Sequence, residues 1–303
     1  MIKRTLCFES DGHLSVKDRQ LVFQAVKDGV PVTKSASIEN LGVVVLESQH
    51  IEISTYALDA LAENNTTVVV CDGAHMPSGT LLPLSGHSET QRVTAAQLAA
   101  PAALREKLWK QTVVAKIRNQ SECLRQNGKN DADRLESLSK FVKAGDPENR
   151  EGTAAATYFK AWGFVRRDSR DDDAPMPNPA LNYGYAILRA CMARALVGSG
   201  LLCVRGIHHH NEYNSMPLAD DIMEPYRPFV DNVVLGQPDV FGPWNTGTFT
   251  RSMKIALLSA LASDVVIGQV RRPLMNAVSY TSASLAACFD GREEKIRYPE
   301  FPS

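Results

Sequence analysis

Three separated stretches of the sequence carry side chains that can bind a metal ion. Glu151 precedes a run of small residues, Gly152 and the alanines at 154–156, which leave room for a substrate or another helix to approach its carboxylate. Three consecutive histidines follow at 208–210, and the acids Asp221 and Glu224 come shortly after them. One interpretation of Glu151 is that its carboxylate is a metal ligand. The alternative is an exposed acid in the first turn of a helix, where the helix dipole favours negative charge.

Asp221 and Glu224 are spaced to share one face of a helix, because residues three apart are neighbours on a helix surface. Two crowded acids repel each other unless a cation lies between them. With an imidazole from His209, these two carboxylates suit Mg²⁺ or Mn²⁺, with water completing the coordination. Pro225 predicts a kink or a stop at Glu224. The alternative is a polar helix start after a solvated histidine run. The surrounding apolar residues favour burial: Leu218, Ala219, Ile222 and Met223.

Other motifs give weaker support for chemistry. The segment Asp72-Gly73-Ala74-His75 and the nearby His87 could bind a metal, but their glycine- and proline-rich context is also typical of loop capping. Cys203 lies near the histidine run without a second thiol at zinc-finger spacing. The G-x-S-x-G and P-loop patterns are absent. The sequence therefore gives no support to a serine hydrolase or an ATPase.

The composition is that of an ordinary soluble globular protein, with 303 residues, 44% hydrophobic and 22% charged. This length predicts two domains or one large one. The six scattered cysteines predict reduced thiols in a cytoplasmic protein rather than disulfides. The start of the chain lacks the apolar segment of a signal peptide, and no apolar run reaches the length of a membrane span.

Charge is distributed unevenly along the chain. The net charge is −1, yet residues 1–91 carry six Lys/Arg and eleven Asp/Glu, a net of −5, whereas the remainder has a net of +4. If the protein binds DNA, we expect the C-terminal part to hold it.

The elements that must position these residues change in type after Gln91. Before it, β-branched runs predict strands at 43–46, 51–53 and 66–70, and helical spacing predicts a helix over 55–63. After it, good helix formers predict helices between 95 and 141, with Trp109, Val113, Ile117 and Leu124 on one face. Lys110, Lys116, Arg118 and Arg125 are expected elsewhere around that helix. Further helices are predicted from Asp146-Pro147, over 182–197 and over 254–267, and a loop over 166–179. The predicted fold class is α+β.

Seven segments of the sequence, taken together and in order, resemble the CRISPR-associated Cas1 family, the spacer-acquisition integrases, in its type II form. The resemblance covers nearly the whole chain. The segments are Ile2–Leu6, Ile38–Glu47, Cys71–Pro77, Gly145–Gly152, Leu181–Ala186, Gly206–His209 and Leu218–Pro228.

This resemblance implies a small N-terminal β-sandwich-like domain that dimerises, residues 1–91, and a larger, mostly α-helical catalytic and DNA-binding domain, residues 92–303. It places the catalytic metal ligands on Glu151, His209 and Glu224, with Asp221 as an accessory acid. The ion is expected to be Mg²⁺ or Mn²⁺. His208 is the alternative imidazole, because the histidine run is degenerate.

The implied reaction is a transesterification in which the 3′-hydroxyl of a short DNA fragment attacks a phosphate at a CRISPR repeat. The implied partners are fragment and repeat DNA, a second copy of the chain, and the small protein Cas2, which bridges two dimers into a heterohexamer; other type II CRISPR proteins are possible partners. The family's basic segment corresponds to the Arg/Asp mixture at 166–173. Three other functions remain as alternatives: a metal-dependent phosphoester hydrolase, a plain nuclease and a non-catalytic scaffold.

Overall fold

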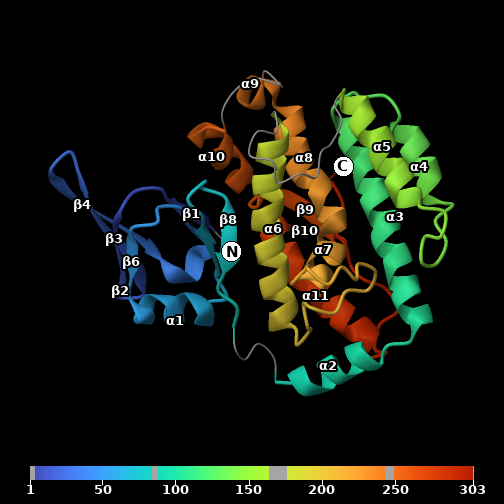
Figure 1. Cartoon of the computed structure of the whole chain (residues 1–303), viewed down its shortest axis with the longest axis horizontal. Helices are drawn as coiled ribbons and strands as arrows, with labels where there is room; N and C mark the ends of the chain where they lie inside the picture. The colour runs from blue at the N-terminus through green and yellow to red at the C-terminus, as the bar shows by residue number, and fades with distance from the viewer. Residues whose placement is uncertain (1–3, 84–87, 164–175, 243–248, 303) are drawn as a thin grey trace. The chain divides into compact units, whose positions relative to one another are not determined.

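The computed structural model describes residues 4–83, 88–163, 176–242 and 249–302, and the chain divides into two compact units, Met1–Leu84 and Ser85–Ser303 (Figure 1). The predicted boundary at residue 91 falls inside helix α2, Thr90–Ala99. The change in composition thus coincides with the first helix of the second unit rather than with the linker that precedes it.

The N-terminal unit contains two four-stranded sheets. The first has the order β1-β5-β7-β8, with β1, β5 and β7 parallel and β8 antiparallel to β7. The second has the order β4-β3-β2-β6. The strands are β1 (Arg4–Phe8), β2 (Gly12–Lys17), β3 (Gln20–Lys27), β4 (Val30–Ser37), β5 (Leu41–Leu46), β6 (Ile51–Ile53), β7 (Thr67–Cys71) and β8 (Pro77–Thr80). The short 3₁₀ helix η1 (Ile38–Asn40) joins β4 to β5.

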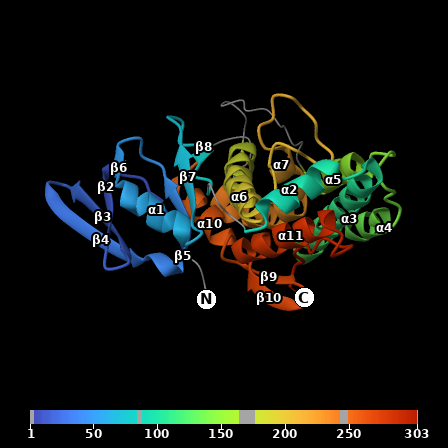
Figure 2. The same cartoon turned by 90° about the horizontal axis from the view of Figure 1, so that it is seen from below.

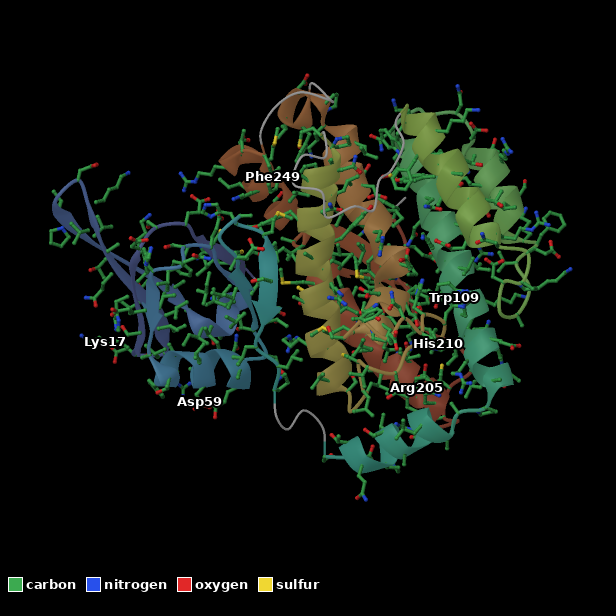
Figure 3. All side chains as sticks on the ribbon, viewed as in Figure 1. Lys17, Asp59, Trp109, Arg205, His210 and Phe249 are labelled. Carbon is green, nitrogen blue, oxygen red and sulfur yellow. The ribbon has the colours of Figure 1, made fainter. Side chains whose placement is uncertain are left out.

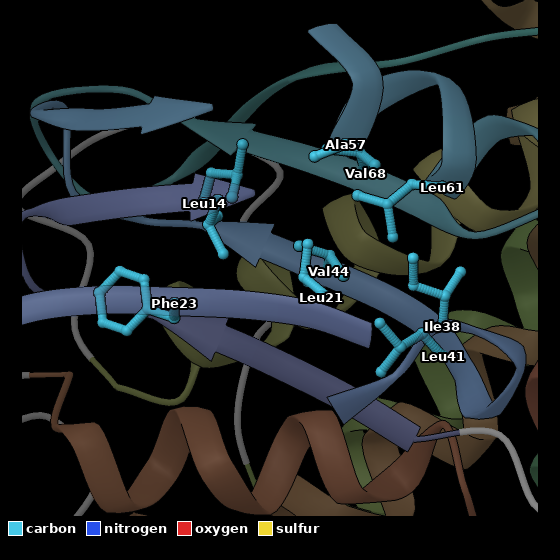
Figure 4. Close-up of a cluster of buried hydrophobic side chains, with 10 residues drawn as sticks. Leu14, Leu21, Phe23, Ile38, Leu41, Val44, Ala57, Leu61 and Val68 are labelled. Atoms are coloured by element: carbon cyan, nitrogen blue, oxygen red, sulfur yellow. The ribbon is translucent and has the colours of Figure 1, made fainter. Parts of the chain in front are cut away.

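One apolar core holds these two sheets and helix α1 (Thr55–Glu63) together. Leu14 and Leu21 come from one sheet, Val44 and Val68 from the other, and Leu61 from the helix, and all are almost completely buried (Figure 4). This packing confirms the predicted sandwich-like unit and the predicted helix over 55–63. The helix begins where Ser54 accepts a hydrogen bond from the Ala57 amide at 3.2 Å, the expected role of a serine at an N-cap.

The C-terminal unit is mostly helical, as predicted. Its helices are α2, α3 (Ala102–Gln126), α4 (Ala132–Ser139), α5 (Arg150–Trp162), α6 (Asn178–Gly198), α7 (Pro217–Met223), the 3₁₀ helix η2 (Glu224–Tyr226), α8 (Arg227–Gly236), α9 (Pro238–Phe241), α10 (Arg251–Ala260) and α11 (Leu274–Phe289). Helices α3, α4 and α5 pack against one another, as both views show (Figure 1, Figure 2). No described helix is long and apolar enough to cross a membrane.

Some predicted boundaries in this unit are wrong. The helix predicted over 254–267 ends at Ala260 and is followed by a hairpin of β9 (Asp264–Ile267) and β10 (Val270–Pro273). Positive φ angles of 58° at Gly268 and 66° at Gln269 suit a tight two-residue hairpin turn, and β-branched residues fill β9. The loop predicted over 166–179 lies mainly outside the described residues, although Asn178 and Pro179 belong to α6.

Candidate metal centre

Glu151 lies in the first turn of α5, and its position is fixed by two capping side chains. Asp146 accepts hydrogen bonds from the backbone amides of Arg150 and Glu151, each at 2.9 Å, and Asn149 accepts one from Gly152 at 3.1 Å. The helix therefore begins at Arg150, and the prediction that it begins at Asp146-Pro147 is wrong. Asp146 still caps the helix, but it lies in the turn that precedes the helix, and its own φ angle is 50°.

Glu224 lies where the chain passes from α7 through η2 into α8, which agrees with the kink predicted from Pro225. The amide of Asn119 on α3 donates a hydrogen bond to the Pro225 carbonyl at 2.7 Å and so ties this turn to the long helix. The Glu224 side chain is only 7% exposed, and its Oε1 lies 3.0 Å from an Arg227 guanidinium nitrogen. The buried carboxyl group of Glu224 therefore lies next to α3.

The cation that links the two glutamates is Lys116 on α3. Its Nζ lies 2.5 Å from Glu224 Oε2 and also contacts Glu151 Oε1, and its side chain is 8% exposed. Burial on its own would raise the pKa of Glu224, but Arg227 and Lys116 outweigh it and lower that pKa. Burial would likewise lower the pKa of Lys116, yet the two carboxylates together raise it. Glu224 and Lys116 are therefore both charged.

Lys116 is predicted to lie away from the apolar face of its helix, and this prediction is wrong. Lys116 is three residues after Val113 and seven after Trp109, so it belongs to the buried stripe, whereas Lys110 and Arg118 are exposed as expected. A lysine at a helical interval from two apolar residues is the sequence feature that could have revealed it.

His209 is held by Asp221, which is completely buried. Asp221 Oδ1 lies 2.5 Å from His209 Nδ1, and the carboxylate also accepts hydrogen bonds from the backbone amides of Ile207, His208 and His209 at 2.7, 2.9 and 3.2 Å. The contact with Asp221 raises the pKa of His209, although burial opposes the shift. When Nδ1 carries the proton toward a carboxylate, Nε2 remains available for a metal.

The neighbouring His208 has a different environment. Its ring stacks on Trp109 at a centroid distance of 4.2 Å with the planes 1° apart, and burial lowers its pKa. Trp109 and the exposed His210 are labelled in Figure 3, between α3 and the loop that leads into α7. These contacts favour His209 over His208 as the imidazole ligand, because only His209 is oriented by a carboxylate.

The set of donors fits a hard divalent cation. Two carboxyl groups converge on one ammonium group, and an oriented imidazole lies close enough for both acids to influence its pKa. Glu151, His209 and Glu224 do not form a set of three ligand atoms all within 4.8 Å of one another; among the described residues, Cys7, Glu9 and Glu47 do. In this conformation the Nζ atom of Lys116 occupies the position between the two glutamates.

The competing site around Asp72 is a capped loop. Asp72 Oδ1 accepts hydrogen bonds from the Ala74 and Met76 amides, both at 3.0 Å, which agrees with the capping interpretation. His75 lies 3.3 Å from Glu47, and His87 lies outside the described residues. Burial raises the pKa of Cys203 to about 12, so this thiol near the histidine run stays protonated.

We predict that Gly206→Ala displaces the loop that carries His209. A methyl group at this position would lie 2.6 Å from the His209 carbonyl oxygen and 2.8 Å from Asp221 Oδ2. Urea unfolding should show a loss of about 1–3 kcal/mol, the usual cost of overpacking.

The matched control is Gly198→Ala at the end of α6, where an added methyl group meets nothing within 4 Å. This variant should be unchanged or slightly more stable, because alanine favours the helix. Equal stability of the two variants would contradict the crowding argument.

Comparisons with known proteins identify the family. A model of the family described as "CRISPR associated protein Cas1" matches residues 6–260. The CRISPR-associated endonuclease Cas1 of Neisseria meningitidis is 37% identical over 237 residues, which cover 78% of this chain and 76% of that protein. The chain therefore belongs to the Cas1 family, a class of CRISPR-associated endonucleases.

Two solved structures share the fold. A casposase bound to its integration product superposes with a TM-score of 0.75 at 20% identity, over 97% of this chain and 92% of the other. A Cas6-RT-Cas1–Cas2 complex superposes with a TM-score of 0.67 at 18% identity, over 97% of this chain and 36% of the other. At these identities the likeness concerns the fold alone.

Proposed function

We propose that this protein is a metal-dependent DNA integrase of CRISPR adaptation that joins fragment 3′-hydroxyl ends to a CRISPR repeat. The observation that carries the proposal is that Glu151 and Glu224 meet at Lys116 while His209, oriented by Asp221, lies within electrostatic reach of both acids. These residues come from separate segments of the helical unit. Membership of a family of CRISPR-associated endonucleases supports a DNA phosphodiester as the substrate of this site.

The proposed reaction exchanges one phosphodiester bond for another. The fragment 3′-oxygen forms a bond to phosphorus as the bond from phosphorus to the repeat strand's 3′-oxygen breaks, and the proton lost by the attacking hydroxyl is balanced by one gained by the leaving hydroxyl. A bound Mg²⁺ or Mn²⁺ ion would supply Lewis acidity toward these oxygens. Glu151, Glu224 and Nε2 of His209 would hold the ion, and Asp221 would keep the imidazole in the required orientation.

No covalent intermediate with the protein is needed. Among the cysteines of the helical unit, burial raises the pKa of Cys203 to about 12 and that of Cys288 to about 11. These groups remain thiols at neutral pH, and a thiol is a far weaker nucleophile than a thiolate. Direct attack by the DNA hydroxyl agrees with this chemistry.

We further propose that the protein acts as a homodimer, with the N-terminal unit in the dimer contact, and assembles with Cas2. This chain shares its fold with a chain of the solved Cas6-RT-Cas1–Cas2 complex. The presence of Cas2 in that complex supports the choice of partner. Lysines and arginines of the helical unit would hold the DNA backbone. The Arg/Asp mixture at 166–173, a candidate for part of this contact, lies outside the described residues.

Single alanine substitutions of Glu151, His209 and Glu224 should each reduce joining at least about 100-fold, in line with the loss of one catalytic interaction. The assay incubates the full chain and its candidate Cas2 partner with a short duplex and a supercoiled plasmid that carries the repeats, and measures covalent joining. Chelation of divalent ions should abolish joining by the unaltered protein.

The control is His208→Ala, which removes the ring stacked on Trp109 but no proposed ligand. This variant should keep most of the activity. Near-normal joining by a folded Glu151→Ala protein, or full activity in excess chelator, would overturn the proposed function.

A further inference from the structure

A buried lysine occupies the position where the two acidic ligands of the proposed metal centre meet. Nζ of Lys116 is in contact with both Glu151 and Glu224, and the two acids come from different elements, α5 and η2. Neither contact is local in sequence. The lysine therefore joins α3, α5 and η2 through one charged group.

In the metal-free protein, the buried surroundings of Lys116 hold its ammonium group against Glu151 and Glu224. Its helix neighbours Val113 and Ile117 are completely buried, and its own side chain is 8% exposed. A buried ammonium group is stable only when paired and hydrogen-bonded. The two glutamates supply that pairing, and in return the lysine cancels the repulsion that would otherwise separate them.

A divalent cation and an ammonium group make competing demands on the same carboxylate oxygens. A Mg²⁺ ion held between Glu151 and Glu224 must lie within about 2.0–2.1 Å of an oxygen of each carboxylate. Nζ of Lys116 is already in contact with one oxygen of each, Oε1 of Glu151 and Oε2 of Glu224. Both cations cannot occupy that position. Either the lysine moves aside or the ion binds elsewhere.

We propose that Lys116 is a built-in competitor of the catalytic ion: it holds Glu151 and Glu224 together before the ion binds and is displaced from them when it does. Lys116 is thus a positioning residue that sets the metal affinity of the site. This inference rests on the proposed function, because it requires that the two glutamates bind the ion.

The test compares Mn²⁺ binding and stability in the unaltered protein and in Lys116→Met, which keeps an unbranched side chain close to lysine in length but removes its charge. Calorimetric titration with MnCl₂ should give a dissociation constant at least about tenfold lower than that of the unaltered protein, because the ion no longer has to displace an ammonium group. Metal-free Lys116→Met should unfold at a lower urea concentration, and saturating Mn²⁺ should remove most of the difference.

Two controls separate this effect from general ones. Lys110→Met removes an exposed lysine from the same helix and should change neither measurement. Lys116→Gln, which can still donate hydrogen bonds to the acids, should give a smaller loss of metal-free stability and keeps the test available if Lys116→Met fails to fold.

The failures of the two proposals can be told apart. If the unaltered protein binds Mn²⁺ no better than Glu151→Gln and Glu224→Gln, the proposed metal centre is wrong. If those variants lose binding while Lys116→Met binds Mn²⁺ equally or more weakly, or keeps its stability deficit at saturating Mn²⁺, the lysine is a permanent structural bridge and this inference is overturned.

Discussion

Replacement of Asp221 by alanine should destabilise the helical unit and disable the proposed metal centre in one step. This fully buried carboxylate accepts three backbone hydrogen bonds and orients His209. Its removal leaves three amide donors without their acceptor in a buried setting. Hydrogen bonds to charged groups contribute about 1.5–3 kcal/mol each, and these losses overlap, so we expect a decrease of about 3–5 kcal/mol in the free energy of unfolding.

The functional consequence follows from the loss of orientation at His209. Loss of the carboxylate that orients a ligand histidine typically reduces metal affinity about 10–100-fold. Urea denaturation and Mn²⁺ titration of Asp221→Ala measure the two effects separately. Asp221→Asn should be intermediate, because one oxygen still accepts hydrogen bonds while its amide nitrogen faces donors.

An exposed acid in the same loop provides the control. Glu212→Ala should change stability by less than about 0.5 kcal/mol, as is usual for surface substitutions, because Glu212 is exposed. A similarly small change in Asp221→Ala would show that the loop does not depend on this carboxylate, and its assignment as the accessory acid would need revision.

The sequence was informative wherever local pattern decides structure. The helix over 55–63 was predicted with its observed bounds, because alternating strand and helix periodicities change sharply on either side of it. The helix predicted over 254–267 was too long, because an apolar β-branched run such as Val265-Val266-Ile267 is compatible with either a buried helix or a strand. Only the pairing of β9 with β10 decides between them.

The sequence reveals the acids and histidines of the candidate site, but it does not reveal the charged group that pairs with the acids. Acids and histidines at suggestive spacing are visible in a sequence, whereas the partner of Glu151 and Glu224 lies 35 residues before the first of them, on another helix. Likewise, Asp221 was expected beside the metal as an accessory acid, but its bonding to three consecutive backbone amides depends on how the histidine loop folds over α7. Such contacts are set by tertiary packing.

Blocking the 3′ ends of the DNA fragment should abolish joining and thereby distinguish an integrase from a plain nuclease with the same site. A nuclease activates water, whereas an integrase must align a DNA hydroxyl, and alignment of reactants can supply about 7–11 kcal/mol of barrier reduction. The described residues supply carboxylates, an imidazole and a lysine that could serve either nucleophile. The difference should therefore appear in the substrate requirement.

The experiment uses the full chain with its candidate Cas2 partner and three duplexes, with free 3′-hydroxyl, 3′-dideoxy or 3′-phosphate ends. Free ends should give plasmid-joined product, and both blocked duplexes should lower the yield to background, because neither carries a free 3′-hydroxyl to attack the phosphate. A duplex blocked at one end only should give product joined to a single strand, since each of two sites in a dimeric assembly would handle one end. Efficient plasmid cleavage with fully blocked duplexes, and no joined product with free ends, would show that water is the nucleophile and that this member of the endonuclease family cuts DNA without integrating it.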